Sequence, residues 1–423
     1  MSSTEHRSSS RRLMQLDAHL DPMERWSGSV LWFGRHLAHD CAGTGPEGGP
    51  PVDTPVMGGA DMLQVRSWVG LDVHAQRTVA SVLDQQTGEI RRARIEGGSG
   101  SVVEFLEGLA GPVRGVYESG PTGYELKRLA EDRGLDVRVC AAGLIPRRPA
   151  DRVKTDRRDA DRLARLLAAG ELSFSRVPSV VEEQLRDLVR AREDLREDLM
   201  RARHRLSKFL LRREVRYPGP GRAWTVPHAL WLQALGFDDA ASQAVFVDYT
   251  SAISALTQRR TALEVGLNDA AAHDQFAWVV ERLRAFRGID TLSAVGLVAE
   301  VGDFHRFPSP GRLAGFLGLV PSEHTSDTKR RQGAITKAGS KHARRLLVEA
   351  AWHYRHPPRI GLTLERRQRG VDPRVCDVAW RAQRRLHQRW VSLKDQRGKP
   401  PGVVAVACAR ELVGFIWEAA TMN

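Results

Sequence analysis

Residues 67–140 alternate between two hydrophobic periods, and this alternation restricts the fold more than any other feature of the sequence. Apolar residues at every second position predict strands, and apolar residues at helical spacing predict helices. The expected order is strand 69–73, strand 78–83, strand 90–95, helix 101–109, strand 113–117, helix 123–133 and strand 135–140. Three early strands followed by alternating helices and strands predict a mixed α/β sheet with helices packed on it.

Two later segments have the spacing of paired helices. Residues 182–216 repeat apolar positions at alternating intervals of three and four, and residues 253–267 do the same. Each run contains one arginine in its seam, Arg192 in the first and Arg260 in the second. Such runs predict either an antiparallel arm or a dimer contact. Because neither run sustains four uninterrupted heptads, amphipathic helices packed on the body of the protein are the alternative.

The charge balance points to a polyanionic partner. The 423 residues include 64 Lys and Arg against 51 Asp and Glu, a formal net charge of +13. This excess predicts binding to nucleic acid first and to an anionic membrane surface second. We expect no membrane span, since the sequence has no apolar run of membrane-spanning length. The four cysteines are scattered without a Cys-x-x-Cys pair, which excludes a disulfide framework and favours a reducing cytoplasm.

The first 65 residues differ from the rest. They begin rich in Ser and Arg and end in a Gly- and Pro-rich stretch. Such a composition buries too little apolar surface to offset the entropy of ordering. The segment is therefore predicted to be a disordered or dispensable extension, and Met62 is a candidate start residue.

Four carboxylates in the alternating region are candidate metal ligands. Asp72 lies within an apolar strand, and Glu118 ends another strand. Asp156 and Asp159 are three residues apart at the start of a helix, so they share one face. Carboxylates buried in this way need a compensating cation, and Mg²⁺ ions can activate an attacking oxygen and stabilise a leaving one in phosphodiester chemistry. Taken singly, an Asp at a helix start is usually a cap, and a Glu at a strand end is usually solvated.

Five short motifs carry a resemblance to a known family. They are Gly-Leu-Asp-Val-His (70–74), Tyr-Glu-Ser-Gly-Pro-Thr-Gly-Tyr (117–124), Lys-Thr-Asp-Arg-Arg-Asp-Ala (154–160), Gly-Leu-Val-Pro (318–321) and Lys-Ala-Gly (337–339). In this order they resemble the transposases of insertion-sequence family 110, which are DEDD-type recombinases. The resemblance covers residues 67–420.

The resemblance implies a ribonuclease-H/RuvC-like catalytic domain over 66–178, a coiled-coil helical linker over 179–278 and a mainly α-helical C-terminal transposase domain over 279–423. It also implies that Asp72, Glu118, Asp156 and Asp159 bind two Mg²⁺ ions. His74, which follows Asp72 by two residues, is expected to pack beside the site or to help position it.

The resemblance further implies that Ser326 attacks DNA and forms a covalent phosphoserine link. The family usually has Gly after this serine, whereas this chain has Asp327. Three nearby hydroxyls are alternative nucleophiles, namely Ser322, Thr325 and Thr328.

Basic residues surround this serine. Seven cations are candidates for neutralising DNA phosphates, namely Lys329, Arg330, Arg331, Lys337, Lys341, Arg344 and Arg345. The only acidic residues nearby are Glu323 and Asp327. A solvated basic face without a ligand is the alternative.

The leading hypothesis is a metal-dependent transposase that cuts and rejoins DNA at an insertion-sequence element. The resemblance implies a guiding noncoding RNA, dimers that pair into a tetramer, and a bacterial, nucleoid-associated protein. Three alternatives remain: a Holliday-junction-type resolvase that uses water, a kinase of ribonuclease-H-like fold, and a non-enzymatic nucleic-acid-binding protein. The charge and the lack of Gly-rich phosphate loops argue against a kinase.

Overall fold

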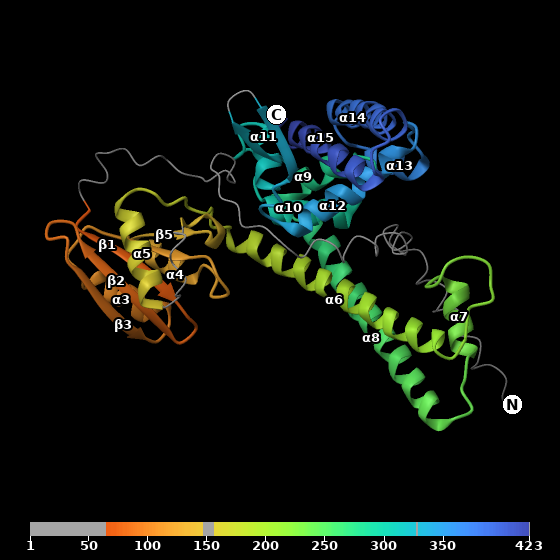
Figure 1. Cartoon of the computed structure of the whole chain (residues 1–423), viewed down its shortest axis with the longest axis horizontal. Helices are drawn as coiled ribbons and strands as arrows, with labels where there is room; N and C mark the ends of the chain where they lie inside the picture. Colours follow the sequence, from red (N-terminus) through yellow and green to blue (C-terminus); the bar gives the residue numbers. More distant parts are fainter. Residues whose placement is uncertain (1–64, 147–155, 327–328, 423) are drawn as a thin grey trace. The chain divides into compact units, whose positions relative to one another are not determined.

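A computed structural model describes residues 65–146, 156–326 and 329–422 (Figure 1). The predicted N-terminal extension and Met62 lie outside these residues. The described chain divides into two compact units. The sheet unit comprises the described parts of Glu47–Glu182 and Gly302–Lys341, and the helical unit comprises those of Glu183–Val301 and His342–Asn423.

The sheet unit contains a five-stranded mixed sheet. Its strands are β1 (Ser67–Val73), β2 (Arg77–Asp84), β3 (Ile90–Glu96), β4 (Val113–Glu118) and β5 (Asp136–Cys140). Their order is β3-β2-β1-β4-β5. Strands β1, β2 and β3 are antiparallel neighbours, whereas β4 and β5 run parallel to β1. The predicted mixed α/β class is confirmed, and each of its predicted elements lies within two residues of an observed one.

Helices cover both faces of this sheet. One face packs Val69 and Leu71 of β1 against helices α3 (Ser99–Glu107) and α4 (Glu125–Asp132). The other face packs Trp68 and Val116 with α5 (Asp156–Ala168). Successive residues of a strand point to opposite faces. The side chains that follow Leu71 and Tyr117 therefore point to the face that α5 covers.

The sheet unit also holds a second, two-stranded sheet. Helix α11 (Pro310–Phe316) leads to β6 (Pro321–Ser326), which pairs antiparallel with β7 (Lys329–Ile335). The sequence predicts a mainly helical C-terminal region, and these two strands are not among the elements it predicts. Both strands consist largely of polar residues without period-2 apolar alternation, so the pattern that identified β1 to β5 is missing.

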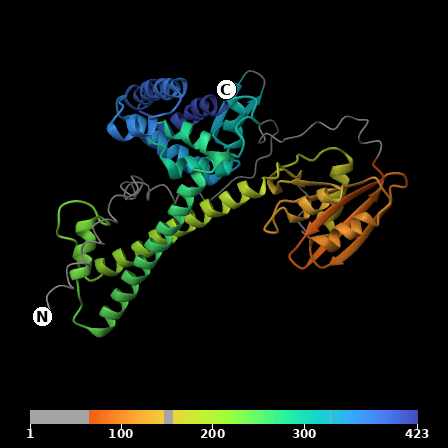
Figure 2. The same cartoon turned by 180° about the vertical axis from the view of Figure 1, so that it is seen from behind.

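The helical unit contains two 32-residue helices that lie side by side, α6 (Val180–Leu211) and α8 (Ala240–Ala271) (Figures 1 and 2). Their contacts show that they run in opposite directions, because Leu188 meets Gly266 and Leu206 clusters with Phe246. We call this pair the arm. The remaining helices of the unit are α7 (Val226–Ala234), α9 (Asp274–Arg284), α10 (Thr291–Val301), α12 (Lys341–Trp352), α13 (Leu362–Gln368), α14 (Pro373–Val391) and α15 (Pro401–Thr421).

The two arginines that interrupt the seams of the arm share one partner. The guanidinium of Arg192 lies 2.7 Å from Glu264, and that of Arg260 lies 3.4 Å from the same carboxylate. Both arginines are buried. A charge inside a helix seam is tolerated only when it is paired, so Glu264 compensates the interruption in both helices.

Two further sequence expectations can be checked on the described residues. No described helix is both long and apolar enough to cross a membrane. The described cysteines Cys140, Cys376 and Cys408 are free thiols.

The shared carboxylate of the arm yields a test of stability. Replacing Glu264→Gln keeps the shape of the side chain but leaves two buried guanidinium groups without their counterion. We expect the free energy of unfolding of the arm to fall by about 3 kcal/mol, measured by urea titration with circular dichroism. The matched control is Asp198→Asn on the same arm, whose partner Arg201 is exposed, and its cost should stay below about 1 kcal/mol. Equal losses in the two variants would contradict this account.

Candidate active site

Two predicted site residues stand at the ends of neighbouring parallel strands. The pairing of β1 with β4 runs from Ser67 opposite Val113 to Leu71 opposite Tyr117. The next position on each strand is Asp72 on β1 and Glu118 on β4. Both side chains follow residues of the opposite face, so both point to the face of the sheet that α5 covers. The fold thus places two carboxylates, 46 positions apart in the numbering, next to each other.

Glu118 differs from the other carboxylates of the sheet. The backbone N–H of Thr87 and the side chain of Arg66 hold the pKa of Asp84 below its usual range. Burial raises the pKa of Asp136, but Arg138 and Arg114 outweigh it and lower the pKa. Arg92 lowers the pKa of Asp161. Glu118 has no ion pair with a cation within the described residues. Burial of the neighbouring Cys140 thiol, together with the negative charge of Glu118, raises the pKa of this thiol to about 12. A half-buried carboxylate in this situation has the capacity to hold an external cation.

Asp72 is also half-buried, and one of its partners is a histidine. The Nε2 atom of His74 lies 3.3 Å from a carboxylate oxygen of Asp72. His74 therefore contacts this carboxylate directly.

Helix α5 approaches β1 unusually closely at Gly70. A Cβ atom on Gly70 would lie 2.1 Å from the carbonyl oxygen of Ala160 and 2.5 Å from the backbone nitrogen of Ala164. No other residue type fits at this position without moving the helix. Because Gly70 lies two residues before Asp72, the close approach brings the first turns of α5 near the end of the strand that carries Asp72.

A carboxylate that the sequence analysis did not single out locks α5 onto the sheet. Asp161 accepts hydrogen bonds from Ser81 of β2 at 2.7 Å and from Arg92 of β3 at 2.7 Å. The hydrogen bond from Arg92 holds the pKa of Asp161 below its usual range. Asp161 lies in the same acidic block as Asp156 and Asp159, yet its partners give it a structural role. Asp161 is two residues from Asp159 and therefore lies on another side of the helix. This spacing is the only sequence feature that could have distinguished its role from that of Asp159.

The two remaining members of the predicted quartet lie on α5. Asp159 is largely buried and forms an ion pair with Arg162 at 2.7 Å. Asp156 is the first residue of α5, and its side chain lies outside what the structure describes. Among the described side chains, no group of three or more Asp, Glu, His or Cys residues is close enough to hold a metal ion. The structure therefore brings Asp72 and Glu118 together and places α5 against β1, and the full quartet stays a prediction.

The available donors nonetheless suit one kind of cation. Asp72, Glu118 and Asp159 offer carboxylate oxygens, which are the ligands that Mg²⁺ prefers. All three are only partly exposed, so bound metal would face limited competition from water.

Ser326 is the last residue of β6, where it pairs with Lys329 of β7. Its side chain lies outside what the structure describes, as do Asp327, Thr328 and the side chain of Thr325. The backbone of Ser326 thus stands at the end of a strand and not in a long loop. This position presents the serine where the two strands of the hairpin meet.

The two glycine motifs that flank this hairpin pack against each other. A Cβ atom on Gly318 would lie 2.3 Å from the carbonyl oxygen of Ala338, and one on Gly339 would lie 2.0 Å from that of Phe316. The backbone nitrogen of Lys337 donates to the carbonyl of Gly318 at 3.1 Å. Both glycines also have a positive φ, near +65°, which side chains disfavour. This contact closes the base of the hairpin and explains why both motifs contain glycine.

The seven predicted cations have different surroundings. Lys337 and Lys341 are exposed. Arg344 is half-buried, and burial lowers its pKa. Arg345 forms ion pairs with Glu193 at 2.7 Å and with Glu349 at 2.9 Å. The side chains of Lys329, Arg330 and Arg331 lie outside what the structure describes.

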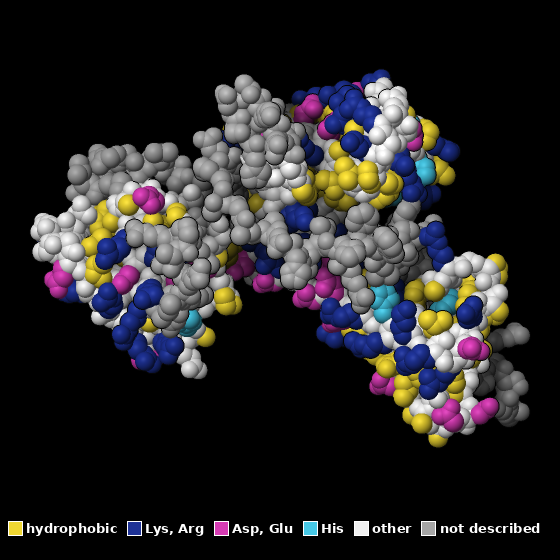
Figure 3. All heavy atoms as spheres, in the orientation of Figure 1, with side chains coloured by type: hydrophobic (Ala, Val, Ile, Leu, Met, Phe, Trp, Pro, Cys, Tyr) yellow, Lys and Arg dark blue, Asp and Glu magenta, His cyan; other side chains and the backbone are white. Residues whose placement is uncertain are grey.

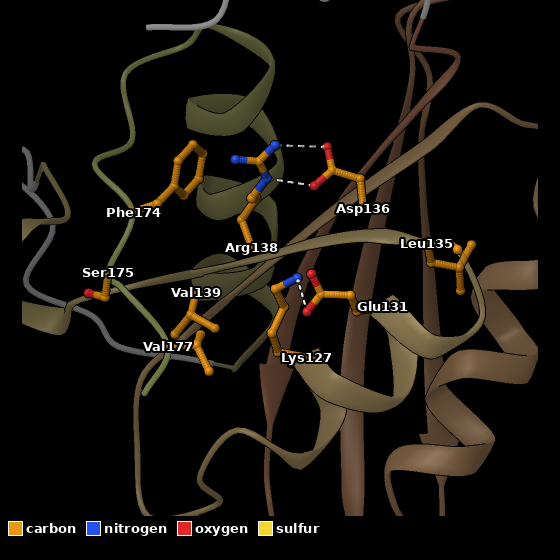
Figure 4. Close-up of a pocket in the computed structure, with 10 residues that line it drawn as sticks. Lys127, Glu131, Leu135, Asp136, Arg138, Val139, Phe174, Ser175 and Val177 are labelled. Atoms are coloured by element: carbon orange, nitrogen blue, oxygen red, sulfur yellow. Dashed lines mark hydrogen bonds and ion pairs between the residues drawn. The ribbon is translucent and has the colours of Figure 1, made fainter. Parts of the chain in front are cut away.

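A hollow beside β5 is not part of this site. It is lined by Lys127, Glu131, Asp136 and Arg138 together with apolar residues such as Phe174 (Figure 4). Its charges neutralise one another, since Lys127 pairs with Glu131 at 2.9 Å and Arg138 pairs with Asp136 at 2.6 Å. None of the four predicted ligands lines it. The hollow therefore offers neither a free charge nor a metal ligand for the predicted chemistry.

Comparison with known proteins gives consistent matches to transposases. A family model described as a transposase of the DEDD type of IS110 matches residues 69–213, and a model of the transposase IS116/IS110/IS902 family matches residues 280–361. A candidate transposase of Sinorhizobium fredii, y4qE, is 41% identical over 372 residues, which cover 86% of this chain and 91% of the relative. The transposase for insertion sequence element IS1533 of Leptospira borgpetersenii is 32% identical over 344 residues, which cover 80% of this chain and 99% of the relative.

The close approach at Gly70 provides a test of the geometry. In Gly70→Ala, the added methyl group collides with the backbone of α5, so the helix must move away from β1. We expect a loss of at least about 2 kcal/mol in the free energy of unfolding of the sheet unit, together with loss of DNA cleavage.

The control for this experiment is Gly143→Ala in the same unit, where an added Cβ meets no atom within 4 Å. This variant should retain the stability of the wild-type protein. A Gly70→Ala protein as stable and active as wild type would show that α5 is not fixed at this distance.

Proposed function

Because the chain belongs to the IS116/IS110/IS902 family of transposases, we propose that it cleaves and rejoins DNA strands at the ends of an insertion-sequence element. The observation that carries this proposal is the placement of Asp72 and Glu118 at adjacent strand ends, on the face of the sheet that α5 covers. A carboxylate pair of this kind is suited to phosphodiester chemistry when it holds a divalent cation.

The sheet unit is proposed to contain a ribonuclease-H/RuvC-like catalytic domain. Its strand order β3-β2-β1-β4-β5 supports this assignment, with three antiparallel strands followed by two that run parallel to β1. The proposed ligands lie at the carboxyl ends of β1 and β4 and at the start of α5. These are the positions at which open α/β sheets place their sites.

We further propose that Asp72, Glu118, Asp156 and Asp159 hold two Mg²⁺ ions. When bound, such ions polarise a phosphoryl oxygen and stabilise the negative charge that develops on it. The protein itself orients the carboxylates: His74 contacts Asp72, and Asp161 fixes the helix that carries Asp156 and Asp159. For Asp159 to bind metal, its ion pair with Arg162 must open or be shared.

Ser326 is proposed to be the nucleophile. Its hydroxyl oxygen forms a bond to phosphorus while the bond from phosphorus to the DNA oxygen breaks, and the serine proton is lost as the leaving oxygen gains one. One phosphoester bond replaces another, so the covalent protein–DNA bond can be exchanged for a new DNA phosphodiester bond in the rejoining step. The backbone supports this role, since Ser326 ends a strand whose base is closed by the contact between Gly318 and Ala338.

Exposed cations near the hairpin, such as Lys337 and Lys341, are proposed to contact the DNA backbone. Arg345 is proposed to do so only if its ion pairs with Glu193 and Glu349 exchange for phosphate. A guiding noncoding RNA and assembly into dimers or tetramers follow from the family resemblance alone. The net charge of +13 is compatible with RNA as a second polyanion.

Trapping a covalent protein–DNA adduct tests the proposed nucleophile. Full-length protein incubated with Mg²⁺ and DNA carrying the element ends should yield an adduct that maps to Ser326 by mass spectrometry. In Ser326→Ala the adduct should disappear, whereas the matched variant Ser322→Ala should retain it. An adduct on Ser322, or strand cleavage that survives in Ser326→Ala without any adduct, would reject the serine and favour hydrolysis by water.

The carboxylates have a separate test. Asp72→Asn and Glu118→Gln should each lower the rate of strand cleavage by at least about 1,000-fold, because each removes a charge needed in the transition state. Glu104→Gln, an exposed carboxylate of the same unit, is the control and should cleave at the wild-type rate. Cleavage that persists in both site variants would reject the proposed metal site.

A further inference from the structure

The arginines of α6 fall into two groups along the helix. Those in its first two thirds are held by partners within the helical unit. Arg186 donates to the carbonyl of Ala299, Arg190 pairs with Glu300, Arg192 with Glu264, Arg196 with Glu193 and Arg201 with Asp198. These guanidinium groups are used to build the unit.

The basic side chains at the distal end of α6 and in the residues that follow it are different. Arg205, Lys208, Arg212 and Arg216 are all exposed, and none has a side-chain partner within the described residues. Residues 202–222 contain seven Lys or Arg and a single acidic residue, Glu214. Like charges at helical spacing repel one another and destabilise the helix. The fold has no structural use for this group of charges.

Three of these cations lie close together in the chain at the end of the arm. Arg205 and Lys208 are three residues apart on α6, which places them about 4.5 Å apart along the helix, and Arg212 lies in the turn directly after the last residue of α6. The buried residues Leu206 and Phe209 turn another side of the helix toward the arm's own core. Figure 3 shows Lys and Arg side chains gathered over this part of the arm.

The distal end of the arm is also firmly built. Phe209 contacts Phe237 and Tyr249 edge to face, and the guanidinium of Arg213 lies 3.8 Å from the centroid of the Phe209 ring. Arg213 additionally donates to the hydroxyl of Ser242 on α8 at 2.8 Å. A row of cations on such a support loses less conformational freedom on binding than one on a mobile tail.

We propose that the distal end of the arm is a second DNA-binding surface, which holds the phosphate backbone of duplex DNA through Arg205, Lys208, Arg212 and Arg216. A row of unpaired, exposed cations is complementary to a phosphate backbone and reads no base sequence. The choice of DNA as the occupant rests on the proposed function. The surface contains none of the proposed catalytic residues, so its binding can be measured independently of cleavage.

The salt dependence of DNA binding tests this surface. The variant Arg205→Gln/Lys208→Gln/Arg212→Gln removes three charges and leaves the seam of the arm intact. The probe is a fluorescent 30-base-pair duplex of arbitrary sequence, titrated with full-length protein in EDTA at several NaCl concentrations. In the variant, the slope of log Kd against log salt concentration should be smaller than in wild type by about 2 to 3. Its Kd at low salt should be about tenfold higher or more.

The control variant is Arg374→Gln/Arg381→Gln/Arg385→Gln. It removes the same charge from the same unit, but at arginines that pair with Asp372, Asp377, Glu418 and Glu411. This control should keep the wild-type slope. The arm variant should keep the wild-type melting temperature, since its three replaced residues are exposed.

Three results would overturn the proposal. The first is an unchanged salt slope in the arm variant, and the second is an equal loss of slope in the control variant. The third is an arm variant that binds duplex DNA as before but loses affinity for a structured RNA of the same length. The two proposals can fail separately. If the arm variant loses duplex binding but still cleaves short single strands, the arm surface acts independently of the catalytic site. If the wild-type protein cleaves no DNA but the salt slope changes in the arm variant as expected, only the catalytic proposal fails.

Discussion

The contact between helix α5 and strand β1 at Gly70 determines what the sheet unit can do. Ala160 and Ala164 of the helix come so close to the strand that only glycine fits beneath them. Asp161 secures the same helix to the neighbouring strands β2 and β3 through Ser81 and Arg92. The helix that carries Asp159 is therefore held against the strand that carries Asp72. Backbone packing brings these residues toward one end of the sheet, although their carboxylates repel one another.

The charged residues of this chain have two kinds of role, which their partners distinguish. Asp161, Glu264 and the arginines in the first two thirds of α6 are paired with other residues of the chain, and they hold helices in place. Glu118 and four cations at the distal end of the arm, namely Arg205, Lys208, Arg212 and Arg216, have no ion pair within the described residues. The unpaired charge of Glu118 is costly because the side chain is half-buried. The arm cations are exposed and repel one another, and a bound polyanion relieves that repulsion. External ligands are therefore expected at both places. A cation suits the first and phosphate suits the second.

Local patterns in the sequence were sufficient to predict the five-stranded sheet, because β1 alternates at Val69, Leu71 and Val73 and the other four strands are short segments between turns or predicted helices. They also indicated Asp72, since an acidic residue inside an apolar strand needs a partner for its charge. They could not show that Arg192 and Arg260 share Glu264, because that pairing joins positions far apart in the chain. Strands β6 and β7 were missed because their residues are mostly polar, and only the pairing itself identifies them. The structural role of Asp161 was hidden within an acidic block whose members look alike.

The central claim is that Asp72 and Glu118 hold a divalent cation together with residues of α5. The most direct measurement is Mn²⁺ binding by electron paramagnetic resonance, with full-length protein and a short duplex of DNA. Wild type should bind Mn²⁺, and Asp72→Asn and Glu118→Gln should each weaken its affinity at least about tenfold. The exposed Glu104→Gln should bind as wild type does. Equal Mn²⁺ affinity and stoichiometry in all four proteins would contradict the account.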